Sequence, residues 1–225
     1  MTRTIDIPTY QTAVVRNCSP TLAGIKPASL FTYPGVYANQ NGKPGAVHIE
    51  ERRSRLLAVI AQCNRELQPL GIHMSVLVWR PCGALIYVYR PADLMRYLSD
   101  PRATTALAAE GYDVHNLPAS LVHLAAHTTL ASSNAAESAY DGSVCALARN
   151  RHCDTGCMCE FPHEIGYFLG YPYEDVHQFI VQHGENYKVF GAWKVYTNVE
   201  QALTTFDSYR GCTQYLTYIY QQATR

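Results

Sequence analysis

The clearest alternation of apolar and polar positions lies between residues 49 and 67. One apolar face repeats there at helical spacing, formed by Ile49, Leu56, Leu57, Ile60, Cys63 and Leu67. Such spacing predicts an amphipathic helix. Pro69 and Gly71 mark its end, because proline and glycine commonly follow the last turn of a helix.

A different pattern follows, in which residues 72–79 and 84–90 are rich in β-branched and aromatic side chains. The two runs flank the turn residues Pro81-Cys82-Gly83, so they predict an antiparallel hairpin. Residues 190–196 have the composition of a third strand. Residues 1–47 are rich in proline and glycine, and we expect them to be mostly irregular apart from one short helix opening at Ser19-Pro20.

Further helices are predicted after the hairpin, at 92–99, 102–110 and 119–131, from Pro162 to Gly170, from Pro172 to Gly184, and from a cap at Asn198 onward. The whole pattern predicts an α+β fold. We expect a small, mainly antiparallel sheet, made of hairpin 72–90 and a strand near 190–196, packed with about six to eight helices. Residues 1–225 are expected to form a single domain with a long cysteine-containing loop at 133–160.

Charge and hydropathy exclude several classes of protein. The chain has 18 basic and 18 acidic side chains and a pI near 7.1, so it lacks the basic field of a nucleic-acid-binding protein. No apolar run approaches the roughly 20 residues that span a bilayer, and the N-terminus lacks the apolar core of a signal peptide. We therefore expect a cytoplasmic protein. Glycine-rich phosphate loops and a G-x-S-x-G motif are also missing from the sequence.

Three of the eight cysteines, Cys153, Cys157 and Cys159, precede His163 closely. Thiolates and imidazole are ligands for zinc, and thiolates hold iron–sulfur clusters. The spacing C-x3-C-x-C departs from the paired C-x2-C of structural zinc sites, so the alternative is a loop with reduced thiols. Cys63 and Cys212 lie in predicted amphipathic helices and are expected to be buried.

A second candidate site centres on Cys18, just before the expected helix start. A helix N-terminus lowers the pKa of a thiol and favours the nucleophilic thiolate. His163 would act as its base and Glu164 or Glu160 would orient that base. Lys26 or Lys194 would supply a cation for an anionic substrate. The alternative is that Cys18 packs under the helix and His163 hydrogen-bonds locally.

His123 and His127 are four residues apart and share one face of a predicted helix. This spacing can hold zinc if a third ligand arrives, but no glutamate follows His123 as in H-E-x-x-H. A solvated or hydrogen-bonded helix face is the simpler interpretation. Glu174 and Asp175 similarly fit the first turn of a helix.

Four blocks of sequence resemble a bacterial family designated domain of unknown function 3793. They are Asn17 to Phe31 (NCSPTLAGIKPASLF), Tyr87 to Pro91 (YVYRP), Glu160 to Val176 (EFPHEIGYFLGYPYEDV) and Gly191 to Tyr196 (GAWKVY). The resemblance covers nearly the whole chain. It implies a single-domain protein typical of anaerobic bacteria and brings no established activity.

Three hypotheses about function follow. The first is a thiol-dependent enzyme that uses Cys18, His163 and Glu164 on an unknown small molecule or a redox protein partner. The second is a non-enzymatic metal-binding or iron–sulfur protein that uses Cys153, Cys157, Cys159 and His163. The third is a partner-binding module without chemistry. We expect neither nucleic acid nor membrane among the partners.

Overall fold

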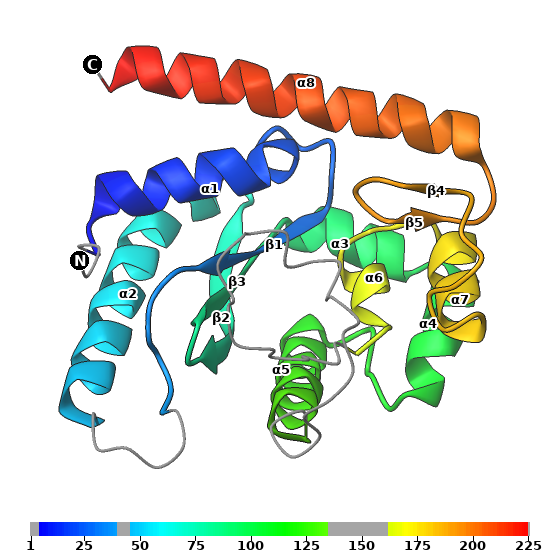
Figure 1. Ribbon diagram of the computed structural model, residues 1–225, viewed down its shortest axis with the longest axis horizontal. Coiled ribbons are helices and arrows are strands. Elements are labelled where there is room, and N and C mark those ends of the chain that lie inside the picture. The colour runs from blue at the N-terminus through cyan, green and yellow to red at the C-terminus, as the bar shows by residue number, and fades with distance from the viewer. Residues whose placement is uncertain (1–4, 40–45, 135–161, 225) are drawn as a thin grey trace.

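The computed structural model describes residues 5–39, 46–134 and 162–224, which form an α+β fold (Figure 1). The helices are α1 (Ile7–Leu22), α2 (Ala46–Leu67), α3 (Pro91–Leu98), α4 (Pro101–Ala109), α5 (Leu117–Asn134), α6 (Ile165–Phe168), α7 (Tyr173–Val181) and α8 (Val199–Ala223). The strands are β1 (Ala28–Tyr33), β2 (His73–Arg80), β3 (Gly83–Tyr89), β4 (Val189–Phe190) and β5 (Lys194–Val195). A single 3-10 turn, Gln68–Leu70, follows α2.

Most of the periodic patterns produce the expected elements. The amphipathic run becomes α2, the hairpin becomes β2 and β3, and Asn198 caps α8 by accepting a hydrogen bond from the backbone N–H of Gln201 at 3.1 Å. Every helix in the described part of the chain is too short or too polar to cross a bilayer.

The N-terminal region differs from the expectation. Helix α1 begins at Ile7, where the Asp6 carboxylate accepts a hydrogen bond from the Thr9 N–H at 2.8 Å. Ser19-Pro20 therefore lies near the end of this helix, and the predicted helix start there is wrong. Residues 28–33, expected to be irregular, form strand β1.

The main sheet has the order β1-β3-β2, with both pairings antiparallel. Strand β3 lies in the middle, which explains why six of its seven residues are buried regardless of the face they point to. Strands β4 and β5 pair with each other in a separate two-stranded sheet. The prediction that 190–196 adds a third strand to the hairpin is therefore wrong, because β1 occupies that position.

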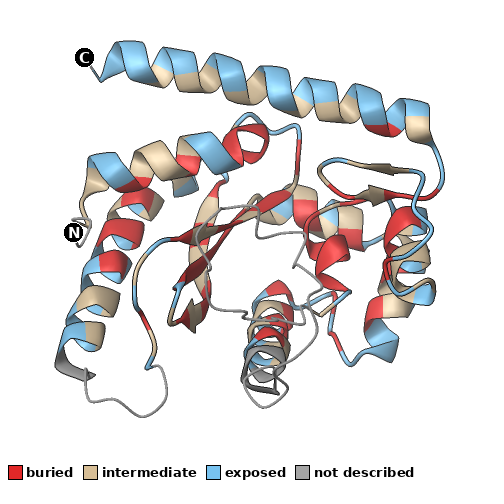
Figure 2. Ribbon diagram, in the orientation of Figure 1, coloured by how far each residue is buried: buried red, intermediate tan, exposed pale blue. Residues whose placement is uncertain are grey.

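Helices cover both faces of the main sheet and create two hydrophobic cores (Figures 1 and 2). Helices α1 and α2 pack on the face that carries Phe31, Met74 and Ile86. Helices α3 to α7 contribute to the core on the face that carries Val78, Leu85 and Tyr87. A bulge between Val76 and Val78 puts Leu77 and Val78 into the same core, although they are consecutive.

Candidate functional site

Cys18 lies in the last turns of α1 and is fully buried in the core beneath α1 and α2. Burial raises the pKa of its thiol well above the ordinary value, and the nearby Lys26 charge offsets only part of this effect. The helix start that was expected to favour a thiolate is at Ile7 instead. In this environment Cys18 is a protonated core residue, which agrees with the packing alternative.

His163 and Glu164 are adjacent in the chain but have different surroundings. The His163 ring is exposed and packs edge-on against Phe179, with ring centroids 5.3 Å apart. The Lys194 ammonium lies 5.6 Å from the centroid of the same Phe179 ring and donates a hydrogen bond to the Gly184 carbonyl at 2.7 Å. The structure thus places His163 near Lys194 and Cys18 near Lys26, and no hydrogen bond, ion pair or ring contact among the described residues joins the two pairs.

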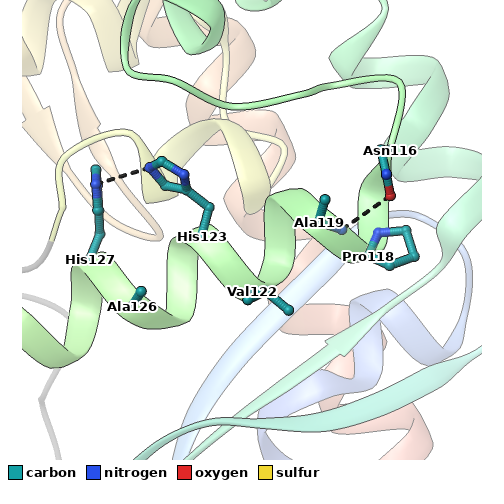
Figure 3. Close-up of a pocket in the computed structure, with 7 residues that line it drawn as sticks. All are labelled: Asn116, Pro118, Ala119, Val122, His123, Ala126 and His127. Atoms are coloured by element: carbon teal, nitrogen blue, oxygen red, sulfur yellow. Dashed lines mark hydrogen bonds between the residues drawn. The ribbon is translucent and has the colours of Figure 1, made fainter.

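Glu164 is buried and belongs to a polar network with Tyr112, His123 and His127. The Tyr112 hydroxyl donates to Glu164 Oε1 at 2.8 Å, and His127 Nδ1 lies 3.2 Å from the same oxygen. His127 Nε2 lies 3.0 Å from His123 Nε2 (Figure 3). The network therefore runs from a buried carboxylate through one imidazole to a second imidazole.

The backbone places these side chains by simple means. His123 and His127 are four residues apart on α5, so they project from the same helix face. Asn116 caps the start of α5 by accepting a hydrogen bond from the Ala119 N–H at 3.2 Å (Figure 3). Gly111 precedes the helix with φ +82°, and a Cβ there would lie 3.3 Å from Cε1 of His123. Glycine at this position leaves room for the imidazole.

The hydrogen-bond pattern determines which nitrogen of His127 carries a proton. A carboxylate only accepts hydrogen bonds, so Nδ1 of His127 is the donor to Glu164. In neutral His127 the lone pair is then on Nε2, which faces His123. Burial, followed by the charge of Glu164, raises the pKa of the Tyr112 hydroxyl, so Tyr112 stays a hydrogen-bond donor.

The two imidazoles border an open pocket of about 580 Å³ on the surface of α5 (Figure 3). The other lining residues are Asn116, Pro118, Ala119, Val122 and Ala126. Solutes in the pocket can reach the two imidazoles. Glu164 and Tyr112 are buried, and Glu164 hydrogen-bonds to His127 from the interior. This combination can bind a cation or exchange a proton.

The model of the family described as "Protein of unknown function (DUF3793)" matches residues 14–225. The chain belongs to this family. The resemblance carried by the four sequence blocks is thereby confirmed. Comparison with curated proteins and with solved structures finds no match.

The site residues of this DUF3793 protein that remain to be placed are the three cysteines before His163 and the carboxylate of Glu164. Cys153, Cys157 and Cys159 fall outside the described residues, so their role as metal ligands stays a prediction. Within the described ranges, no group of three or more His, Cys, Asp or Glu side chains is arranged to hold a metal ion. Glu164 was expected to orient His163, but its described partners are His127 and Tyr112.

The sequence contained a partial signal for this network. The spacing of His123 and His127 indicated a shared helix face. Nothing local linked them to Glu164, which is 37 positions from His127, or to Tyr112 in the turn before α5. Spacing alone therefore favours a solvated or hydrogen-bonded helix face, and the structure shows the hydrogen bonds.

Proposed function

We propose that this protein binds a divalent transition-metal ion of the zinc class through Nε2 of His123 and Nε2 of His127. The observation that carries the proposal is the 3.0 Å approach of these two nitrogens beside an open pocket. Two imidazoles bound to one tetrahedral zinc at ~2.0–2.1 Å have their nitrogens roughly 3.3 Å apart. The pair needs only a small adjustment to replace its shared proton with a metal ion.

Glu164 supports the proposal as an orienting residue. Histidines that bind metals usually donate their second ring N–H to a carboxylate or carbonyl group, which fixes the tautomer and the ring orientation. The contact from His127 Nδ1 to Glu164 has this form, and Tyr112 donates to the same carboxylate oxygen. Because Glu164 Oε1 faces Nδ1, it serves as a support for the ligand. The described ligands are therefore two, in agreement with the lack of a cluster of three among the described residues.

The sequence offers candidates for the remaining coordination positions. Cys153, Cys157 and Cys159 shortly precede Glu164 in the chain, and thiolates combine readily with imidazole around zinc. This part of the proposal rests on the sequence. It retains the metal-binding hypothesis but replaces His163 with the two histidines of α5.

The test is metal binding by the full chain, measured by elemental analysis after anaerobic purification and by titration with Zn²⁺ and Co²⁺. Cobalt reports its ligands directly, because its visible spectrum depends on them. We expect about one equivalent of bound metal. His123→Ala combined with His127→Ala should abolish specific binding, and Glu164→Gln should weaken it by about 10- to 100-fold, as loss of an outer-shell partner does.

His115→Ala is the matched control, because His115 is exposed in the turn just before α5. Its metal affinity should equal that of the wild type. Equal affinities for the wild type and the double histidine variant would refute the proposal. Protection of Cys153, Cys157 and Cys159 from iodoacetamide by the metal would identify mixed histidine and thiolate ligation, whereas unprotected thiols would identify a site completed by water.

A further inference from the structure

Lys26 is a buried cation at the junction of three parts of the fold. It follows α1, and only 9% of its surface is exposed. Its ammonium nitrogen lies 4.9 Å from the ring centroid of Tyr171, which precedes α7, and 5.8 Å from that of Tyr209 on α8. The next residue, Pro27, packs so closely against Gly170 that a Cβ on this glycine would lie 2.2 Å from the proline ring. The backbone beside Lys26 is thus held in place.

Among the described residues, the charge of the Lys26 amine faces only the Tyr171 and Tyr209 rings and has no anionic partner. Among the described residues, no carboxylate lies within ion-pair distance of Nζ, and no acceptor forms a hydrogen bond with it. Buried ammonium groups are usually paired, since desolvation disfavours the charged form. Burial lowers the pKa of Lys26 to about 8. A desolvated lysine of this kind presents part of its population as the neutral, nucleophilic amine near neutral pH.

A pocket of about 390 Å³ opens beside this lysine. It is lined by Gly24, Ile25, Lys26, Pro27, Asp93, Arg96 and Tyr97. The Arg96 side chain is 77% exposed and forms an ion pair with Asp93 at 3.1 Å. An exposed guanidinium that forms such a surface pair can exchange that partner for the anionic group of a ligand at little cost. Lys26 and the accessible guanidinium of Arg96 therefore border the same opening.

We propose that Lys26 is a reactive amine that forms an imine with an aldehyde or ketone carrying an anionic group, which Arg96 binds. The nitrogen lone pair attacks the carbonyl carbon to form a carbinolamine. The carbonyl oxygen then leaves as water, taking up the two protons that the amine gives up, and a carbon–nitrogen double bond remains. The step needs neither an oxidant nor a reductant. It is independent of the metal site on α5.

Reductive trapping tests this proposal directly. The chain contains only four lysines, Lys26, Lys43, Lys188 and Lys194, so peptide mass spectrometry can follow each of them. Full-length protein would be incubated at pH 7.5 with sodium cyanoborohydride and one of three probes: glyoxylate, pyridoxal 5′-phosphate or the neutral propionaldehyde. Lys188 is the internal control, because its amine is near the surface and hydrogen-bonds only weakly to the Thr197 carbonyl at 3.4 Å. The rate at which Lys188 is modified is compared with the rate at Lys26 in the same sample.

We expect Lys26 to be modified at least 10-fold faster than Lys188 by an anionic probe. Preference for glyoxylate would identify a carboxylate as the anionic group, and preference for pyridoxal 5′-phosphate would identify a phosphate. Arg96→Ala should lower the rate at Lys26 with anionic probes at least 5-fold and leave the rate with propionaldehyde unchanged. This exposed variant keeps Lys26 in place, so the test does not depend on the folding of a Lys26 variant.

Two results would overturn the inference. If Lys26 reacts no faster than Lys188 with every probe, its amine is not activated. If Lys26 reacts fast but is insensitive to Arg96→Ala and to the charge of the probe, the assignment of an anionic ligand is wrong. Lys26→Arg, which keeps the cation and removes the nucleophile, should eliminate the fast-reacting site and confirm the mapping.

Discussion

The Trp193 indole N–H donates a hydrogen bond to Asp175 Oδ2 at 2.7 Å, in the interior of the protein. The other oxygen of Asp175 accepts hydrogen bonds from the Tyr196 and Thr197 N–H groups at 2.9 and 3.0 Å and from the Thr197 hydroxyl at 3.0 Å. Asp175 is the penultimate residue of the block EFPHEIGYFLGYPYEDV, and Trp193 lies in GAWKVY. Two of the blocks that carry the family resemblance are therefore joined by one buried carboxylate, which favours a structural role for these positions.

Replacing Asp175 should destabilise the fold strongly. Asp175→Ala would leave four donors without an acceptor, and breaking a buried charged network costs on the order of 3 to 5 kcal/mol. Glu174→Ala is the matched control, since its exposed ion pair with Arg102 is worth at most ~1 kcal/mol. Urea unfolding of both variants measures the difference. Equal stabilities would show that the Asp175 network contributes little.

The Cys18 thiol should be alkylated more slowly than the Cys82 thiol in the native protein. Its burial and raised pKa oppose formation of the reactive thiolate, whereas Cys82 is exposed in the turn between β2 and β3. With iodoacetamide at pH 8 we expect Cys82 to react faster by on the order of 100-fold or more, because Cys18 must wait for local opening. The two rates should converge in denaturant. Faster labelling of Cys18 than of Cys82 in native protein would restore the thiol-enzyme hypothesis.

Gly111→Ala should weaken metal binding through the position of His123. The new Cβ would lie 3.3 Å from the imidazole and would move it away from His127. Gly71→Ala is a closely matched control, because Gly71 has φ +75° against +82° for Gly111 but its nearest neighbour is the Arg90 side chain at 3.8 Å. Both variants should lose about 1 kcal/mol of stability from backbone strain. Only Gly111→Ala should also lower the affinity for Co²⁺.

The stability contributed by Lys26 should depend on pH in a defined direction. Burial lowers its pKa to about 8 in the folded protein, from an unfolded value of 10.5. Below pH 8 both states are protonated and the folded state carries the full cost of the buried charge. Between pH 8 and 10.5 the unfolded state binds more protons, so this cost is relieved as pH rises.

A comparison of Lys26→Met with the wild type isolates this effect. The stability of the variant relative to wild type should be highest below pH 8 and should decline toward pH 10.5. Thermal unfolding across that range measures the decline. A difference that stays flat over this interval would mean that burial does not lower the pKa of the Lys26 amine.

The sequence alone predicted the α+β class, the hairpin and most of the helices. These features depend on local signals: the apolar face of α2, the turn Pro81-Cys82-Gly83, and the cap at Asn198. Capping and periodicity act within a few residues along the chain, so they can be read without knowing which segments meet. The family resemblance also came from the sequence and is confirmed over residues 14–225.

Only the tertiary structure decided which segments pair and which side chains meet. Residues 28–33 become a strand by pairing along one edge of β3, whereas β4 and β5 pair with each other in a separate sheet. The same packing buries Cys18 beneath α1 and α2 and brings Glu164 to His127 across 37 positions. Burial and long-range contacts determine the chemistry of these groups, and neither can be inferred from residue spacing, because the path of the chain between them is a property of the whole fold.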